Sequence, residues 1–374
     1  MERWTTGQFD TLILDGKTSG SVNLLQTLSR ELGQSICVVR CTVLDRTTSA
    51  QWKGTGATLI PEDTDAPALV ATIKRSIRIR DWMADAAIKK LVAQIRKLPA
   101  QPKLHTQVTE ELQSAAGSMD VVGQLIAQEP VMSAKILQVV NSAFFGLTRE
   151  VSDATESVMV LGAERIKALI LLAGVFSQYS GSKCPSFAPE TVWNHCLQVG
   201  VFARSITLAE TKNPRLAEAA FTAGLLHDIG KLVLAGNLPE MYDTVQRLKQ
   251  SKQITSREAE LEILGTTHAE LGACLLATWG LPLPILEAIA WHHKPACSDE
   301  KSFSLLAAVH AANAFTQENL PGDAPREVID ISYLMHAGLG DCRNRWREIC
   351  GVPTKTHEET PDEQQRRRRE AKVN

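Results

Sequence analysis

Histidine occurs at several places in this sequence where the side chain could bind a metal ion. The most informative is the adjacent pair His227 and Asp228 in AGLLHDIGKL, because an imidazole and a carboxylate side by side can bind one divalent ion. Helical bundles complete such sites with inward-pointing His and Asp side chains from several helices. Further histidines in stretches with helical spacing are His195, His268, His292, His293 and His310. Imidazole together with carboxylate favours Zn, Fe, Mn or Ni over Ca.

The chemistry that such a site could perform is hydrolysis. A metal ion with an open coordination position activates water for attack on a phosphate ester. Lys231 follows His227 by about one helical turn, so its ammonium group could stabilise an anionic substrate. The spacing of His195, His227 and Asp228 by itself leaves two interpretations open: a metal site, or buried histidines that bond to backbone carbonyls.

The elements that would position these side chains are mainly helices. From Asp81 to about residue 317 one block of helical apolar spacing follows another, and one predicted helix, at 214–235, contains His227. The first eighty residues alternate helix-like stretches with β-branched runs at Thr11–Leu14, Ile36–Val43 and Ala57–Ile60. Strands that alternate with helices indicate a parallel sheet with helices on its faces. We therefore predict a mainly α protein, in which an all-helical domain follows a small partial α/β segment.

The composition excludes several classes of protein. The 374 residues carry a formal net charge of −2 and are 44% hydrophobic, which is typical of a globular chain and indicates neither DNA nor an anionic membrane as a partner. No run of about 18 apolar residues is present to form a transmembrane helix. The eight cysteines form no Cys-x-x-Cys pair, and the first residues lack the apolar core of a signal peptide. These features predict reduced thiols and a cytoplasmic location.

Several stretches of the sequence resemble a known family. AGLLHDIGK, with WNHC upstream and WHHKP downstream, looks like the HD superfamily. LIAQEPVMSAKILQVVNSAFFG and SDATESVMVLGAERIKALIL resemble more specifically the HDOD domain, an all-helical signalling module related to the HD and HD-GYP phosphodiesterases. The resemblance runs from about Leu91 to Thr316. It implies a bacterial-type signal-transduction protein.

The resemblance also implies roles for individual residues. HD enzymes bind metal through a His, the His-Asp pair and a later Asp, and HD-GYP relatives add further His ligands. Carried over to this sequence, the ligands of one or two ions of Fe, Mn, Zn or Ni are His195, His227, Asp228, His268, His292, His293 and His310. Asp228 and Lys231 take the catalytic positions. Two departures bear on activity: His310 replaces the later Asp, and the Gly-Tyr-Pro element expected after His293 is absent.

The first eighty residues resemble part of a response-regulator receiver domain. FDTLILDG looks like its third strand, which places Asp15 at the phospho-acceptor position, and GATLIPED looks like its fifth. The usual Lys before Pro61 is Ile60, and the acidic pair that binds Mg²⁺ in receivers has no counterpart upstream. A phosphoryl group on Asp15 would lack its metal ion and its counter-cation. We expect a truncated receiver-like segment that is inactive in phosphorylation.

The chain divides into five predicted parts, and two functions stay open for it. The parts are a receiver-like segment at 1–80, a linker helix at 81–97, the HDOD domain at 98–320 with its HD-like half at 190–317, an extension at 321–351 and a disordered tail at 352–374. One function is a regulatory or scaffold module that acts through protein partners in signalling and retains a metal site. The alternative is a metal-dependent phosphohydrolase or phosphodiesterase acting on a nucleotide or a cyclic dinucleotide. The exposed edge of an incomplete sheet also permits a homodimer.

Overall fold

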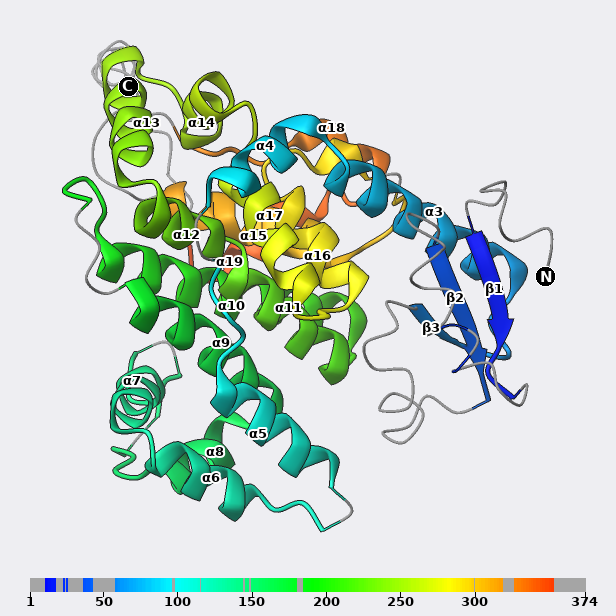
Figure 1. Ribbon diagram of the computed structural model, residues 1–374, viewed down its shortest axis with the longest axis vertical. Helices are drawn as coiled ribbons and strands as arrows, with labels where there is room; N and C mark the ends of the chain where they lie inside the picture. The colour runs from blue at the N-terminus through cyan, green and yellow to red at the C-terminus, as the bar shows by residue number, and fades with distance from the viewer. Residues whose placement is uncertain are drawn as a thin grey trace, which may run out of the picture.

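A computed structural model of the protein consists mainly of helices, with a small sheet towards the N-terminus (Figure 1). The structure describes residues 11–17, 23, 25, 36–42, 58–95, 98–114, 116–143, 145–147, 149–179, 184–298, 300–318 and 326–352. The predicted fold class, mainly α with a partial α/β segment, is confirmed. Apart from Val352, the tail predicted at 352–374 lies outside the described residues. Within them, no helix is long and apolar enough to cross a membrane.

The sheet has three parallel strands that coincide closely with the three β-branched runs of the sequence. In spatial order they are β1 (Thr11–Asp15), β2 (Ile36–Cys41) and β3 (Thr58–Pro61). Both faces of the central strand are covered, since Val38 and Val39 point to opposite faces and both are fully buried. Asp15 ends β1 at the carboxyl edge of the sheet. That it is inactive in phosphorylation stays a prediction.

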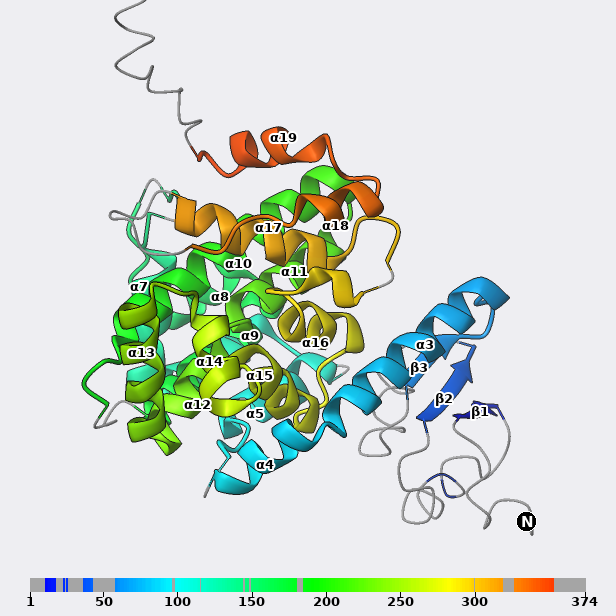
Figure 2. The same cartoon turned by 90° about the horizontal axis from the view of Figure 1, so that it is seen from above.

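Helix α3 (Ala66–Met83) joins the sheet to the helical domain (Figure 2). Leu69, Ile73 and Ile77 of α3 pack against β2 and β3, whereas Ile79 is buried in the core of the helical domain. One continuous helix therefore belongs to both hydrophobic cores. The boundary that we predicted between residues 80 and 81 falls inside α3, which continues to Met83. The next helix, α4 (Ala86–Gln94), begins after its N-cap residue, Asp85.

Two arginines of α3 hold this helix against α16 (Leu283–Ala290). Arg75 Nε lies 2.5 Å and Arg78 Nη2 lies 3.4 Å from the carboxylate of Glu287, whose side chain is 4% exposed. The Arg78 guanidinium also lies over the ring of Trp291, 5.7 Å from its centroid. Since Trp291 directly precedes two of the predicted metal ligands, α3 touches the helix that carries part of the candidate site.

The described residues that follow α3 form a helical domain, and most of its helices contribute to one hydrophobic core. Its first group of helices is α5 (Lys103–Gln113), α6 (Met119–Ala127), α7 (Pro130–Val140), α8 (Ala154–Leu161) and α9 (Ala163–Tyr179). The second group is α10 (Pro189–Thr211), α11 (Pro214–Leu226), α12 (Ile229–Asn237), α13 (Pro239–Lys252), α14 (Ser256–Leu264), α15 (His268–Thr278), α16, η1 (Pro295–Cys297) and α17 (Leu305–Glu318). Helices α18 (Ile331–His336) and α19 (Cys342–Ile349) follow. They bury Leu334 and Trp346 in the same core, so the predicted extension packs onto the domain.

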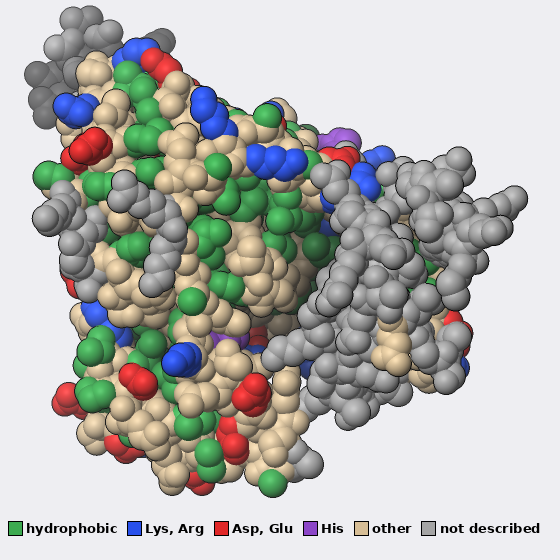
Figure 3. Space-filling view, in the orientation of Figure 1, with side chains coloured by type: hydrophobic (Ala, Val, Ile, Leu, Met, Phe, Trp, Pro, Cys, Tyr) green, Lys and Arg blue, Asp and Glu red, His purple; other side chains and the backbone are tan. Residues whose placement is uncertain are grey.

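The face of the molecule in Figure 3 carries both signs of charge. Side chains of both signs are scattered over its described part, with Lys and Arg more frequent in the upper part of the view and Asp and Glu more frequent in the lower part. This mixture agrees with the formal net charge of −2. Nothing on this face marks it as a surface for a polyanion.

Candidate metal centre

Five histidines and one aspartate converge inside the second group of helices. They come from four places: the middle of α10, the turn between α11 and α12, the N-terminus of α15 and the turn after α16. In that order the residues are His195, His227, Asp228, His268, His292 and His293. All but His195 sit at helix ends, where the chain changes direction and a side chain can reach the interior. All six belong to the ligand set that we predicted.

The His-Asp pair is placed by a helix break that the sequence analysis missed. The apolar spacing predicts one continuous helix at 214–235, but α11 ends at Leu226 and α12 begins at Ile229. Asp228 has backbone angles of φ −100° and ψ 9°, away from the α-helical values. The break directs both side chains inward, since His227 is 0% and Asp228 is 1% exposed.

The carboxylate of Asp228 lies at the middle of the cluster, with different histidines beside each of its oxygens. Nε2 of His195 and Nε2 of His227 lie 3.6 Å and 3.5 Å from Oδ2. Nε2 of His268 and Nε2 of His292 lie 2.9 Å and 4.0 Å from Oδ1. The described residues thus offer two groups of ligand atoms that share Asp228. If metal ions bind here, Asp228 would be available as a ligand to both groups.

Hydrogen bonds to the backbone fix which ring nitrogen of two histidines faces the cluster. Nδ1 of His227 donates to the carbonyl of Gly224 at 2.6 Å, and Nδ1 of His292 donates to the carbonyl of Ile289 at 2.7 Å. Both neutral rings therefore turn an unprotonated Nε2 towards Asp228. Nε2 of His292 is buried and has no hydrogen-bond partner among the described residues. A buried lone pair of this kind is costly unless a cation or a proton occupies it.

The same argument applies to His195. Its Nδ1 lies 3.2 Å from the hydroxyl of Thr316, which donates its own proton to the carbonyl of Asn313 at 2.7 Å. The Thr316 oxygen can then only accept, so Nδ1 of His195 is the donor and Nε2 is unprotonated. Nε2 of His195 and Nε2 of His227 lie 3.2 Å apart. Two lone pairs so close repel each other, and a metal ion beside Asp228 would relieve that repulsion. The residues present fit a metal ion.

Two carboxylates beside the cluster, one buried and one half-buried, escaped the sequence analysis. Glu260 of α14 accepts hydrogen bonds from Nδ1 of His268 at 2.7 Å and from the backbone N–H of the same residue at 2.8 Å. Glu327 lies 3.2 Å from Nδ1 of His293. A carboxylate on the outer nitrogen of a histidine ligand orients the ring and raises its basicity. These two glutamates therefore have the positions of residues that tune a metal site.

Burial and charged neighbours set the protonation of the cluster. Burial lowers the pKa of His195 to about 3. Burial lowers the pKa of His268 as well, but the Glu260 carboxylate and its neighbours outweigh it and raise that pKa to about 9. Burial alone would raise the pKa of Asp228, yet the adjacent imidazoles and Lys231 hold it well below its usual range. The cluster thus contains an ionised carboxylate, a neutral His195 and a protonated His268, whose Nε2 proton would have to leave before that nitrogen could bind a metal ion.

A pocket of about 450 Å³ opens onto the cluster, lined among others by Asp228, His195 and His293. Lys231 lies on its wall and donates a hydrogen bond to Oδ2 of Asp228 at 2.7 Å. Lys249 also lines the pocket, and burial lowers the pKa of its ammonium group. Two lysines above a cluster of metal-ligand atoms suit an anionic ligand such as a phosphate ester.

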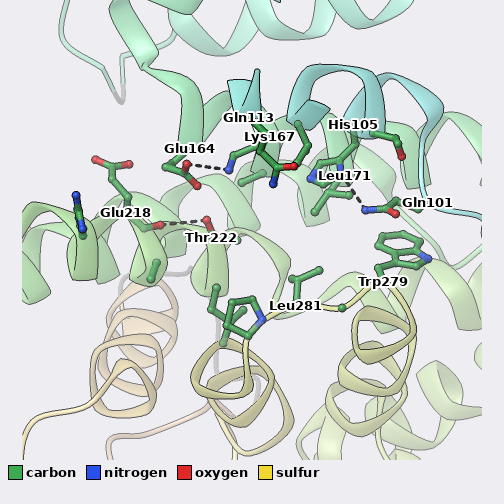
Figure 4. A pocket seen from close by; sticks show the side chains of 18 of the residues that line it. Gln101, His105, Gln113, Glu164, Lys167, Leu171, Glu218, Thr222, Trp279 and Leu281 are labelled. Atoms are coloured by element: carbon green, nitrogen blue, oxygen red, sulfur yellow. Dashed lines mark hydrogen bonds and ion pairs between the residues drawn. The ribbon is translucent and has the colours of Figure 1, made fainter. Parts of the chain in front are cut away.

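A larger hollow, of about 830 Å³, lies elsewhere (Figure 4). Helices α5 and α9 line one side of it, and α11 and the turn between α15 and α16 line the other. Its charged side chains include the ion pair of Glu164 with Lys167 at 2.8 Å, and Trp279 lies towards one end. It shares no lining residue with the pocket above the cluster. We place the candidate site at the smaller pocket, because the convergent ligand atoms line that one.

His310, the seventh predicted ligand, does not join the cluster. Its Nδ1 donates to the carbonyl of His292 at 2.7 Å, and its Nε2 accepts a hydrogen bond from the N–H of Asp330 at 2.8 Å. With both ring nitrogens engaged, His310 has no lone pair to offer a metal ion. We correct the predicted ligand set accordingly and leave His310 out of it.

Gly230 lets α12 approach α15 closely enough for the parts of the cluster to meet. A Cβ atom on this residue would lie 1.9 Å from the carbonyl oxygen of His268. We predict that Gly230→Ala costs roughly 1–3 kcal/mol of folding free energy, as overpacking does. It should also weaken metal binding, because α15 must move away and carries His268 with it. Denaturant unfolding and metal titration measure the two effects, and wild-type values for both would contradict this role of Gly230.

Comparison with known sequences gives one family and one curated relative. Residues 98–295 match the HDOD domain family. An uncharacterized protein of Treponema pallidum is 29% identical over 270 residues, which are 70% of this chain and 51% of that protein. The chain thus spans about half the length of this relative.

Several solved structures share the fold. An HDOD domain protein of unknown function from Geobacter sulfurreducens has a TM-score of 0.56 at 22% identity, covering 71% of this chain and 95% of that one. A proposed metal-dependent phosphohydrolase from Shewanella amazonensis has a TM-score of 0.50 at 18% identity, with coverages of 77% and 95%. A proposed signal-transduction protein from Marinobacter aquaeolei has a TM-score of 0.52 at 19% identity, with coverages of 89% and 82%. At these identities the likeness concerns the fold alone.

Proposed function

The chain belongs to the HDOD domain family, and on this premise we propose that it is a signal-transduction protein whose helical domain binds one or two divalent transition-metal ions and hydrolyses a phosphate ester. The observation that carries the proposal is the convergence of unprotonated Nε2 atoms of His195, His227 and His292 on the carboxylate of Asp228. These nitrogen and oxygen donors favour Zn, Fe, Mn or Ni. The Shewanella protein of the same fold is described as a proposed metal-dependent phosphohydrolase, which agrees with this chemistry.

The metal ions and the residues around them would have different roles in hydrolysis. Bound at this centre, a divalent ion supplies Lewis acidity and a more acidic water molecule. Asp228 and the histidines hold the ion. Lys231, which pairs with Asp228 in this structure, binds and orients an incoming phosphate at the pocket wall. Lys249 adds a second positive charge along the pocket, so that the pocket favours an anion such as a nucleotide.

Metal content and hydrolysis test this function together. The full chain is freed of metal with a chelator, reconstituted separately with Mn²⁺, Fe²⁺, Zn²⁺ and Ni²⁺, and assayed with bis(p-nitrophenyl) phosphate and a panel of nucleotides. We expect one or two bound ions and hydrolysis that requires them. A chain that binds none of the four metals would overturn the proposal. A chain that binds metal without hydrolysing any phosphate ester would overturn its catalytic part.

Replacing Lys231 separates catalysis from metal binding. We predict that Lys231→Ala lowers kcat by roughly 10²–10³-fold, the loss seen when one group that stabilises transition-state charge is removed. The variant should keep its metal, because the change releases Asp228 from its ion pair. The matched control is Lys252→Ala, which replaces an exposed lysine of α13 that is paired with Glu262. Steady-state kinetics and metal analysis provide the measurement, and an unchanged kcat would remove Lys231 from the mechanism.

A regulatory module without turnover is the second candidate function. The observation in its favour is the contact of α3 with α16, which joins the receiver-like segment to the helix that leads into His292 and His293. In this function protein partners act on the N-terminal segment, and the metal centre stabilises the domain or senses a ligand. A homodimer through the sheet edge belongs to the same candidate. Bound metal without turnover, together with a partner whose affinity depends on that metal, would favour it.

A further inference from the structure

A short segment that follows α17 lies across the candidate metal centre. We call this segment, Arg326–Asp330, the strap. It is anchored on the last turn of α17, because Arg326 Nη1 donates to the carbonyl of Glu318 at 2.9 Å and the backbone N–H of Glu327 donates to the side-chain oxygen of Gln317 at 3.0 Å. The strap lies outside the residues, 98–295, that match the HDOD family.

The first contact of the strap with the centre is made by Glu327. Its carboxylate oxygen Oε1 lies 3.2 Å from Nδ1 of His293, and its side chain is 18% exposed. The two atoms are in close contact, although they are not aligned for a hydrogen bond. Glu327 also lines the pocket above the cluster, on the same wall region as His293. A carboxylate in this place faces the outer nitrogen of the ring whose Nε2 points to the cluster.

The second contact runs through His310. Nε2 of His310 accepts from the backbone N–H of Asp330 at 2.8 Å, and Nδ1 donates to the carbonyl of His292 at 2.7 Å. His310 is 4% exposed, so water does not compete for these bonds. The side chain of Asp330 in turn caps α18 by accepting from the N–H of Tyr333 at 2.9 Å. An imidazole thus ties the strap to the backbone of the turn that carries two ligands.

We infer that the strap is a positioning element of the metal centre, in which Glu327 orients the ring of His293 and His310 holds the backbone of His292. The inference rests on the proposed function, since it assigns roles around the metal that this function requires. Neither residue touches the metal or the reacting atoms. Partners that orient a histidine ligand in this way typically contribute roughly 10–100-fold to metal affinity. The role also explains why the residue at position 310 is buried and bonded at both nitrogens without being a ligand.

Co²⁺ is the probe for this inference, because its visible absorption spectrum reports the geometry of its ligands. The full-length variants Glu327→Ala and His310→Ala should bind Co²⁺ roughly 10–100-fold more weakly in chelator competition, with an altered spectrum. Glu327→Gln and His310→Gln keep a group of similar shape that can accept or donate a hydrogen bond. They should recover part of the Co²⁺ affinity and part of the wild-type spectrum. Glu348→Ala and His336→Ala replace exposed residues of the same C-terminal region and should match the wild type. Thermal unfolding of the metal-free variants reports whether each one folds.

The possible results separate the strap from the proposed function. Wild-type Co²⁺ affinity and spectrum in both alanine variants would overturn the inference, while loss of Co²⁺ in His227→Ala would leave the metal centre standing. A wild-type chain that binds no Co²⁺ would overturn the function and the inference with it. If an alanine variant does not fold, its glutamine variant decides: weaker binding with an altered spectrum supports the inference, and wild-type behaviour contradicts it.

Discussion

Asp228→Asn is expected to remove the metal ions from this protein. Asp228 is the residue common to both groups of ligand atoms, so one substitution affects both ions. Loss of a partner that merely orients a ligand weakens metal binding by roughly 10–100-fold, and loss of a shared ligand should exceed that range. Elemental analysis of the purified chain and competition with a chelator measure the change. Asp120→Asn, at an exposed aspartate in the first turn of α6, is the matched control.

The same substitution has a second effect that needs its own control. It removes the partner of Lys231, and breaking one side of a buried ion pair costs roughly 3–5 kcal/mol. Lys231 is 18% exposed and can turn partly to water, so we expect a loss near the lower end. Asp228→Asn combined with Lys231→Met removes both charges and should be more stable than the single variant. His227→Ala leaves the pair intact and should still lose metal. Wild-type metal content in both Asp228→Asn and His227→Ala would place the metal elsewhere.

The members of the candidate centre could be predicted where sequence neighbours carry the chemistry. His227 and Asp228 are adjacent, and His292 and His293 are adjacent, so each pair is visible without a structure. The geometry between pairs could not be predicted, because it depends on the close approach of α12 to α15 at Gly230. A motif gives the identity of ligands, whereas packing decides which of them share an ion.

The residues around the ligands were the part that sequence spacing could not provide. Glu260 lies eight residues before His268 on a different helix, and Glu327 follows α17 outside the span of the resemblance. Nothing local distinguishes either glutamate from a solvent-exposed one. His310 shows the opposite error. Its place in a helix made it a plausible ligand, but two hydrogen bonds that come from sequence-distant backbone occupy its ring.

Parts of the fold show the same division between local and long-range causes. The three strands were predicted because β-branched runs are a local signal. The break between α11 and α12 was missed because apolar spacing continues through it: Ile229 is as buried as Leu225 and Leu226 before it. Tertiary packing sets both the break and the continuation of α3 past the predicted boundary. In both cases the apolar spacing of the sequence identifies the buried residues but does not show where a helix ends and the chain changes direction.

Replacing Arg75 and Arg78 together by Ala should cost roughly 3–5 kcal/mol of folding free energy, because it leaves the carboxylate of Glu287 buried without its cations. Glu287 is 4% exposed, and of its polar side-chain contacts among the described residues only the hydroxyl of Ser298, at 3.0 Å, remains. Glu287→Gln should cost less. It leaves two arginines that are 20% and 24% exposed, and these can turn to water. Denaturant unfolding measures both variants, with Lys74→Ala on the exposed side of α3 as the control.

Comparing the stability losses of the double arginine variant and of Glu287→Gln also tests how far the N-terminal segment can act on the metal centre. If the double arginine variant is the less stable one, adding Glu287→Gln to it should restore part of the loss, since the stranded charge is then gone. The double variant should also raise hydrogen exchange in α16 and lower metal affinity, because α16 leads into His292 and His293. Equal losses for both variants would mean that the contact stabilises by packing alone. Unchanged hydrogen exchange in α16 would mean that α3 only connects the two parts of the chain, and that the receiver-like segment does not affect the metal ligands through α16.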